Sequence, residues 1–184
     1  MEHAIYIVSG IPGAGKTTVS RLLAQHFEHG VHIESDLLQK LIVTGGVWPD
    51  GQPSGTSTVW GDEAEGQRQL RLRCRNASLL AGSFFEAGFT PVIDDVVIGG
   101  RLEHFRSDIQ SRPLLFILLV PDHNVVAQRD ATRPEKHVFE KWGHLDEVMR
   151  AETPKVGLWL DSSGITAEET VDEVLRRADE ARVE

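Results

Sequence analysis

The sequence contains almost no cysteine and no hydrophobic run long enough for a membrane span. Cys74 is the single cysteine among 184 residues, so an internal disulfide is excluded and a reducing cytoplasm is the expected location. The longest uninterrupted apolar run, Leu114 to Val120, is far shorter than the roughly 20 residues that cross a bilayer. No secretory signal pattern is recognisable at the N-terminus, and we expect no membrane association.

Positive charge is also scarce. Nineteen Lys and Arg residues face 28 Asp and Glu residues, which gives a formal net charge of -9. Binding along a nucleic-acid backbone depends on clustered Lys and Arg, so we expect no extended nucleic-acid surface. A small anionic substrate stays compatible with this composition. The histidines at 26, 29 and 32 lack the spacing of a metal site.

A glycine-rich motif near the N-terminus carries the strongest functional signal. The segment Gly10 to Thr17 reads G-x-x-x-x-G-K-[ST], directly behind an apolar run at 4–8 and ahead of a helical pattern at 19–27. This strand, loop and helix order predicts a phosphate-binding loop for a nucleoside triphosphate. We expect the nucleotide to contact Gly10, Ile11, Pro12, Gly13, Ala14, Gly15, Lys16, Thr17 and Thr18.

Each residue type in the loop has a physical role. Glycines allow successive backbone N–H groups to converge on phosphate oxygens, and the following helix adds its positive dipole end. Lys16 is expected to reach the β- and γ-phosphates, and the Thr17 hydroxyl to ligate Mg²⁺. The expected cofactors are therefore ATP and Mg²⁺. A dinucleotide site would need G-x-G-x-x-G, which this glycine order does not provide.

The order of apolar runs predicts the fold class. Strands are expected near 4–8, 31–34, 90–94, 114–120 and 156–161, each followed by a helical segment. This alternation predicts an α/β protein with a three-layer P-loop NTPase fold, similar to nucleoside kinases. Its mostly parallel five-stranded sheet would carry helices on both faces, and ligands would bind at the carboxyl ends of the strands. We expect one domain over residues 1–184.

Two insertions interrupt the alternation. The first, at about 44–60, is rich in glycine and contains Trp48 and Trp60. A long connection in a compact domain is usually functional or disordered, and exposed tryptophans favour a function, so we expect it to cover the acceptor. The alternative is that its tryptophans pack onto the core. The second, at about 129–140, is expected to be a lid, with Pro134 ending the preceding helix.

A long helix is expected near 62–87. Its apolar face would carry Leu70, Cys74, Ala77, Ala81 and Phe84, and its opposite, solvated face Arg68, Arg71 and Arg75. Arg73 flanks the apolar face and could reach inward.

Acidic residues follow two of the strands. Asp36 comes after the second strand, where its carboxylate could accept the proton of an acceptor hydroxyl; with Gln39 three positions later, it also fits a helix cap. Asp94 and Asp95 end the third strand, at a usual place for an acid that holds Mg²⁺, and either could do so. A structural turn is the alternative for this pair.

Arg129 and Arg133 lie four residues apart, on one helical face at the mouth of the second insertion. Such arginines can stabilise charge in the transition state of phosphoryl transfer. The alternative is a surface ion pair.

Together these segments resemble the chloramphenicol phosphotransferase-like family of small P-loop kinases. The resemblance rests on the phosphate loop, residues 34–38, the Asp-Asp-Val-x-x-Gly-Gly stretch from Asp94, the segment 129–133 and residues 158–163. It implies that Asp36 is the base that activates the acceptor hydroxyl, that the loop binds ATP and that Arg129 and Arg133 contact phosphates. A third lid arginine of the family has only Lys136 near its place.

The expected function is an ATP-dependent phosphotransferase that moves the γ-phosphate to a hydroxyl of a small molecule. An antibiotic is one candidate acceptor, although the insertion at 44–60 shows no match to the family and the antibiotic itself is not implied. Two alternatives stay open: a nucleotide-dependent switch or slow ATPase, and a kinase of nucleotides or polynucleotide ends. The oligomeric state is not predicted by the sequence.

Overall fold

A five-stranded parallel sheet forms the centre of the molecule. The computed structural model describes residues 3–131 and 143–183. The strand order is β2-β3-β1-β4-β5, and every neighbouring pair runs parallel. The strands are β1 (Ile5–Ser9), β2 (Gly30–Glu34), β3 (Thr90–Asp94), β4 (Leu114–Leu119) and β5 (Leu158–Leu160). All five strands predicted from the apolar runs are confirmed.

The inner strands are buried on both faces. Every residue of β1, β3 and β4 is buried, which explains why these segments read as continuous apolar runs and not as alternating ones. The edge strand β2 is more exposed at its start, and its sequence is accordingly more polar.

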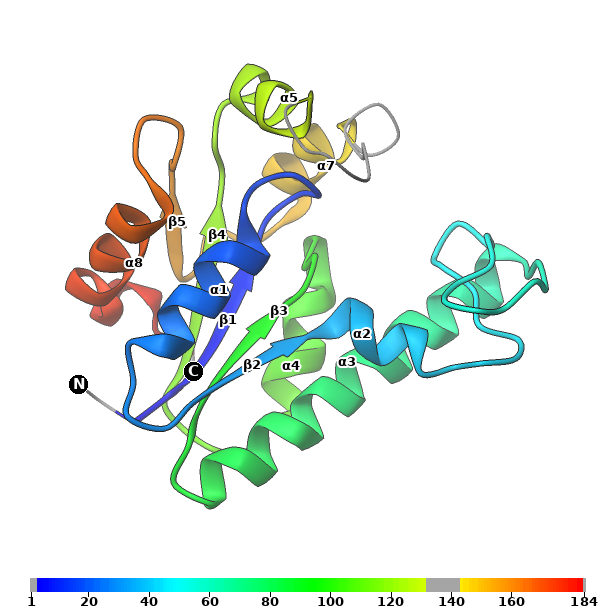
Figure 1. Ribbon diagram of the computed structural model, residues 1–184, viewed down its shortest axis with the longest axis horizontal. Coiled ribbons are helices and arrows are strands. Elements are labelled where there is room, and N and C mark those ends of the chain that lie inside the picture. Colours follow the sequence, from blue (N-terminus) through cyan, green and yellow to red (C-terminus); the bar gives the residue numbers. More distant parts are fainter. Residues whose placement is uncertain (1–2, 132–142, 184) are drawn as a thin grey trace.

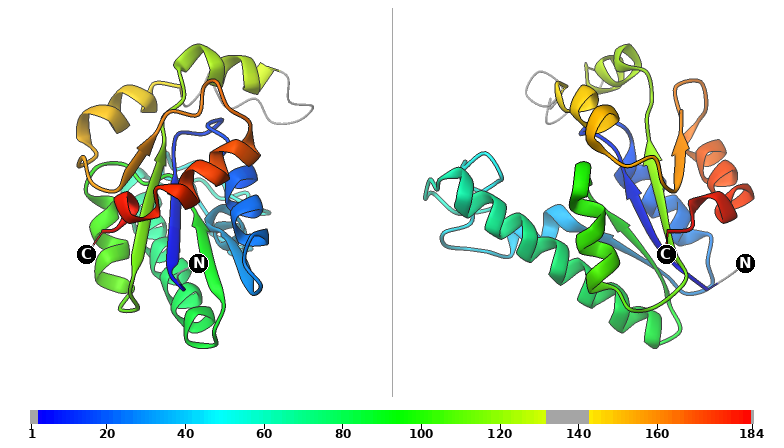
Figure 2. Two further views of the ribbon diagram at one scale, coloured as in Figure 1. Left: turned by 90° about the vertical axis from the view of Figure 1, so that its left-hand side faces the viewer. Right: turned by 180° about the vertical axis from the view of Figure 1, so that it is seen from behind.

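Helices cover both faces of the sheet (Figures 1 and 2). On one face lie α1 and α8, which contact each other, and on the other lie α3 and α4. The helices are α1 (Lys16–Gln25), α2 (Ser35–Lys40), α3 (Glu63–Glu86), α4 (Leu102–Asp108), α5 (His123–Ala131), α7 (Leu145–Glu152) and α8 (Ala167–Arg176), with short 3₁₀ turns η1 (Gly99–Arg101) and η2 (Ala178–Ala181). This arrangement confirms the predicted three-layer P-loop NTPase fold.

The carboxyl ends of the strands all point to one end of the sheet. Asp94 pairs in register with Val8 of β1 and with Glu34 of β2, so the ends of these three strands lie side by side. The segments that follow β1, β2 and β3 therefore meet at this edge, as the sequence predicts for a doubly wound fold.

The first insertion connects α2 to α3 and forms a separate lobe, coloured cyan at the right of Figure 1. Its chain folds back on itself through a bridge between Val47 and Pro53. Trp48 is half-buried, whereas 70% of Trp60 is exposed. The alternative that the tryptophans pack onto the core therefore holds in part for Trp48 and does not hold for Trp60, whose side chain is at the surface.

The long helix α3 matches its expected apolar face with one exception. Leu70, Cys74, Ala77 and Ala81 are buried. Phe84 was expected with them and is 36% exposed; it lies in the last turn of α3, and its ring packs edge-on against Phe89. Within the residues that the structure describes, no helix has the length and apolar content needed to cross a membrane.

Candidate active site

The phosphate-binding loop connects β1 to α1, as the motif predicts. Gly13 and Gly15 both have φ near +95°, a backbone conformation that residues with a side chain rarely adopt. Gly15 is the residue before α1, so the free N–H groups of the first helical turn belong to residues from Lys16 onward. The loop thereby combines turned backbone amides with a helix N-terminus, the arrangement that binds phosphate.

The loop is closely packed against α5. A Cβ atom placed on Gly13 would lie 2.8 Å from Cγ1 of Val126, so the absence of a side chain lets α5 approach the loop. Lys16 Nζ donates a hydrogen bond of 3.2 Å to the carbonyl oxygen of Ile11, which keeps the ammonium group over the loop.

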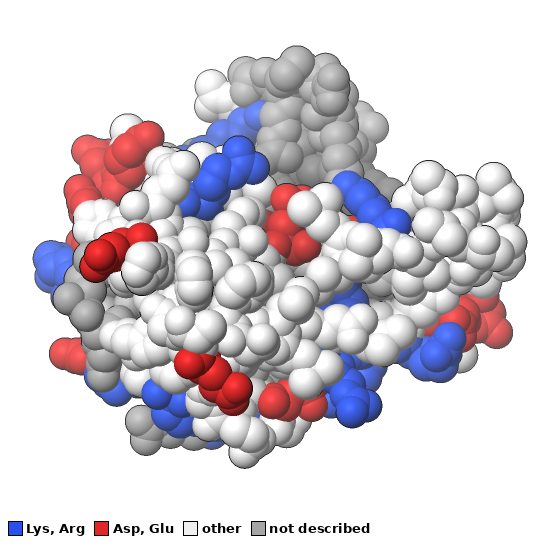
Figure 3. All heavy atoms as spheres, turned by 60° about the horizontal axis from the view of Figure 1, so that its bottom comes forward, with Lys and Arg blue, Asp and Glu red and all other residues white. Residues whose placement is uncertain are grey.

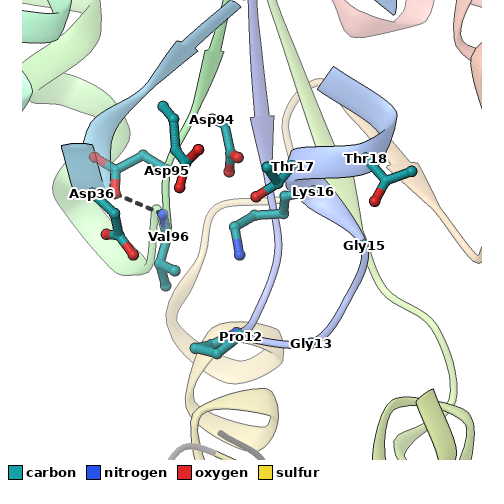
Figure 4. Close-up of a pocket in the computed structure, with 11 residues that line it drawn as sticks. Pro12, Gly13, Gly15, Lys16, Thr17, Thr18, Asp36, Asp94, Asp95 and Val96 are labelled. Atoms are coloured by element: carbon teal, nitrogen blue, oxygen red, sulfur yellow. Dashed lines mark hydrogen bonds between the residues drawn. The ribbon is translucent and has the colours of Figure 1, made fainter. Parts of the chain in front are cut away.

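A cavity of about 430 Å³ opens in front of the loop, and residues from three strand ends line it (Figure 4). The loop contributes one wall, and acidic residues after β2 and β3 form the other. The lining residues are Pro12, Gly13, Gly15, Lys16, Thr17, Thr18, Glu34, Asp36, Asp94, Asp95 and Val96. The structure therefore brings together the loop, Asp36, Asp94 and Asp95, which the sequence assigned to one site.

Asp94 faces the phosphate loop and lies beside Thr17 and Lys16 in Figure 4. Burial disfavours its charged form, but His32, Lys16 and Thr17 outweigh burial and hold the pKa of Asp94 below its usual value. His32 Nε2 is 3.6 Å from Asp94 Oδ2, too far for a hydrogen bond, and within the described chain both atoms are buried without a hydrogen-bond partner. An ionised carboxylate next to the Thr17 hydroxyl, at the wall of the cavity, fits a Mg²⁺ ion.

Asp95 has a different environment, although it is the next residue. Its Oδ1 accepts hydrogen bonds from Arg73 Nη2 and from the Val96 N–H, each at 2.7 Å. Its Oδ2 lies 3.9 Å from Cys74 Sγ, and burial is the main reason that the pKa of this thiol rises to about 12. Asp95 is thus engaged by the protein itself, so Asp94 is the better candidate of the pair for the metal.

Asp36 lies on the wall opposite the phosphate loop. It stands in the first turn of α2, whose N-cap residue is Glu34, and Gln39 is hydrogen-bonded to other segments. The alternative that Asp36 caps the helix with Gln39 is therefore wrong. Arg73 Nη1 approaches Asp36 Oδ1 to 3.2 Å, and 41% of the Asp36 side chain is exposed. The carboxylate is held on one side and open on the other.

Of the two arginines predicted for the lid, Arg129 lies within the described residues, and it is not among the residues that line the cavity. Arg129, on α5, donates from Nη2 to the carbonyl oxygen of Ser162 at 2.8 Å, which joins α5 to the segment after β5. Arg133 and most of the predicted lid at 129–140, with Lys136, lie outside the described residues.

Arg73 is the site residue that the sequence indicated least clearly. Only 5% of its side chain is exposed, and it contacts carboxylates on two other segments. Arg71, two positions earlier, was expected on the solvated face; it forms an ion pair with Asp108 of α4. Helical spacing alone gives no sign of which arginine meets a carboxylate.

The surface beside the site is uneven in charge. Figure 3 shows acidic residues in the hollow between the body of the molecule and the lobe of the insertion at the right, whose visible surface is largely uncharged. Between residues 44 and 60 the one charged residue is Asp50. Several apolar side chains of the lobe and of α2 are exposed: Leu37, Leu41, Val43, Val59 and Trp60.

The strand order and the loop between β1 and α1 give the protein the P-loop NTPase fold, which it shares with solved structures of small-molecule kinases. Residues 2–45 match the family model described as Zeta toxin. A search of curated proteins finds no sequence match. The resemblance to chloramphenicol phosphotransferases stays a prediction, because the structural comparisons show the fold and the family model matches only residues 2–45.

Solved structures share the fold over nearly the whole chain. A sugar kinase from Janibacter sp. HTCC2649 is 17% identical, with a TM-score of 0.68, over 98% of this chain and 96% of that one. The tunicamycin resistance protein of Deinococcus radiodurans is 14% identical, with a TM-score of 0.63, over 100% and 99%. Shikimate kinase from Acinetobacter baumannii, in complex with shikimate, is 21% identical, with a TM-score of 0.58, over 95% and 91%.

Proposed function

We propose that the protein is an ATP- and Mg²⁺-dependent kinase that phosphorylates a hydroxyl group of a small molecule. The observation that carries the proposal is the position of Asp36, whose carboxylate lines the same cavity as the phosphate loop, on the opposite wall. A hydroxyl bound between them has a proton acceptor on one side and the transferable phosphate on the other. The kinases among the structural neighbours support the same class of reaction.

In this proposal each residue of the site has a separate role in phosphoryl transfer. Backbone amides of the loop and Lys16 hold the β- and γ-phosphates, and Asp36 accepts the hydroxyl proton as the hydroxyl oxygen bonds to the γ-phosphorus. The bond from the γ-phosphorus to the β–γ bridging oxygen breaks, and ADP leaves. Asp94 and Thr17 would hold Mg²⁺, which neutralises charge on the phosphates when it is bound.

The acceptor is proposed to bind beside the lobe of the insertion, 44–60. Leu37 directly follows Asp36 on α2 and is 52% exposed, and the exposed apolar side chains of the lobe continue from it along the chain. Arg129 and Arg133, in the lid expected at 129–140, are proposed to contact the phosphates of the nucleotide. Antibiotics, which the resemblance to chloramphenicol phosphotransferases suggests, are one group of acceptors to be tested. We propose the cytoplasm as the location of the protein.

A screen for acceptor-stimulated ADP release tests the proposal. The purified protein is incubated with Mg²⁺, ATP and single compounds from a panel of hydroxylated metabolites and antibiotics, and phosphorylated products are identified by mass spectrometry. We expect stimulation by at least one small alcohol, with no stimulation in the Lys16→Met variant. ADP release that responds to no alcohol, or only to a protein, would point to a nucleotide switch, and label transfer to an oligonucleotide 5′ end would point to a polynucleotide kinase.

A further inference from the structure

Arg73, on α3, connects the two acidic segments of the site, which carry Asp36 and Asp95. It projects from the middle of α3, and its two terminal nitrogens contact different carboxylates: Nη1 lies 3.2 Å from Asp36 Oδ1, and Nη2 lies 2.7 Å from Asp95 Oδ1. Asp36 belongs to α2 and Asp95 follows β3. One guanidinium group thus joins a helix of the outer layer to two segments at the edge of the sheet.

The two contacts differ in their surroundings. Asp95 is 2% exposed and also accepts the Val96 N–H, so this end of the bridge is buried and fixed. Asp36 is 41% exposed, and its contact with Arg73 uses one oxygen, Oδ1. Arg73 is therefore held firmly by Asp95 and holds a partly exposed Asp36 in turn.

The charge on Arg73 is maintained in spite of burial. Burial opposes a charged guanidinium, but the charges of Asp95 and Asp36 outweigh this effect and raise the pKa of Arg73. Arginine suits the position because its planar group presents separate nitrogens in a fixed fork, whereas lysine has one charged nitrogen. The Nε atom is buried without a hydrogen-bond partner within the described residues, so the two Nη contacts account for the bridge.

We propose that Arg73 is a positioning residue that orients the Asp36 carboxylate toward the acceptor hydroxyl, with Asp95 as its anchor. The inference rests on the proposed function, in which Asp36 is the base. Arg73 occupies one carboxylate oxygen from the protein side, and the cavity side of Asp36 stays open to the acceptor. Arg73 itself touches neither nucleotide nor acceptor in this account.

Substitutions of Arg73, with a matched control on the same helix, test the inference. Arg73→Met removes the bridge, and Arg71→Met removes the ion pair with Asp108, outside the cavity. With an acceptor found in the ADP-release screen, we expect Arg73→Met to lower kcat about 10²-fold, because displacement of a catalytic group by about 1 Å has this effect. The KM for ATP should stay within about threefold, since Arg73 does not line the nucleotide loop, and Arg71→Met should change neither value.

Combination with Asp36→Asn separates positioning from a general structural effect. If Arg73 acts through Asp36, Arg73→Met should lower kcat no further once Asp36 is Asn. An equal loss in both backgrounds, or kcat in Arg73→Met within threefold of the original protein, would overturn the inference. Arg73→Met could leave Asp95 as an unpaired buried charge, so the Arg73→Met/Asp95→Asn variant, which removes both charges, is measured in parallel.

A second measurement needs no acceptor. Crystal structures of the original protein, Arg73→Met/Asp95→Asn and Arg71→Met are determined with Mg²⁺ and a non-hydrolysable ATP analogue. We expect the Asp36 carboxylate to move by about 1 Å or more, or to occupy several rotamers, only when Arg73 is replaced. If Asp36 does not move, the inference about Arg73 is overturned, even if the protein is a kinase. If Asp36 moves but the screen finds no acceptor, Arg73 does position Asp36, and it is the proposed function that fails.

Discussion

Gln39 Nε2 donates a hydrogen bond of 2.9 Å to Gln69 Oε1 and thereby joins α2, which carries Asp36, to α3. Both side chains are buried. Each also binds the backbone of the insertion: Gln39 donates to the Val47 carbonyl oxygen at 2.9 Å, and Gln69 accepts the Val47 N–H at 2.9 Å. The two amides therefore fix the lobe proposed to bind the acceptor against the helix proposed to carry the base.

Replacement of Gln69 by Ala should loosen this lobe. The change leaves the buried Val47 N–H without its acceptor and removes one of the hydrogen bonds that the Gln39 amide donates, which should lower the free energy of unfolding by about 1–3 kcal/mol. The KM for the acceptor should rise while nucleotide affinity is unchanged. Chemical denaturation and steady-state kinetics measure both effects, and Gln67→Ala, at an exposed position of the same helix, is the control. Equal effects of the two substitutions would contradict this role.

Gly13→Ala should impair nucleotide binding through the backbone. Gly13 has φ +95°, and an added Cβ would lie 2.8 Å from Val126 Cγ1, so strain of about 1–3 kcal/mol is expected together with displacement of α5 from the loop. Calorimetric titration with ATP should show weakened binding. Gly82→Ala, where an added Cβ meets nothing within 4 Å, should leave binding unchanged and stability equal or higher.

Asn substitutions at Asp94 and Asp95 should produce different defects. Asp94→Asn removes the acid proposed for the metal and should reduce Mg²⁺-dependent ATP affinity roughly 10- to 100-fold, with little change in affinity without Mg²⁺. Asp95→Asn leaves Arg73 short of a buried partner and should lower the free energy of unfolding by about 3–5 kcal/mol. Nucleotide titrations with and without Mg²⁺, and denaturation curves, distinguish them. Loss of Mg²⁺ dependence in Asp95→Asn alone would reverse the assignment.

The ion pair between Arg71 and Asp108 should make part of the stability depend on acid pH. The hydrogen bonds from Arg71 are the main reason that the pKa of Asp108 lies below its reference value of 3.8. A carboxyl whose pKa is lowered by folding stabilises the protein above its unfolded pKa and loses this effect as pH falls through the folded pKa. Between neutral pH and strong acid, Asp108→Asn should therefore lose about 1 kcal/mol less stability than the original protein. Parallel slopes in denaturation measured across this range would exclude such a contribution.

The sequence predicted the position of the glycine-rich loop between β1 and α1, and the five strands, because their signals are local. The motif from Gly10 to Thr17 is contiguous, and its backbone requirements are encoded in its glycines. The strands were found because inner parallel strands are apolar on both faces and so appear as uninterrupted runs. Asp36 was placed across the cavity because the ends of neighbouring parallel strands meet at one edge of the sheet.

The sequence did not predict the contacts of Arg73 with two carboxylates or the hydrogen bonds of Gln39, because the partners are distant in the chain. Arg73 lies between an apolar and a polar face of α3, and only the position of α2 and β3 shows that its guanidinium meets two carboxylates. Gln39 was interpreted as part of a helix cap because its spacing from Asp36 fits one, whereas its partners are 30 and 8 residues away. Asp94 and Asp95 were equivalent in sequence, and their surroundings distinguish them in the fold.

The central claim, that Asp36 serves as the base of a kinase, is tested most directly by the Asp36→Asn variant. Asn keeps the size of the side chain and removes its ability to accept the hydroxyl proton. With an acceptor identified by ADP release, we expect phosphoryl transfer to fall by at least about 10²-fold while ATP affinity remains that of the original protein. Transfer at the original rate in Asp36→Asn would contradict the account.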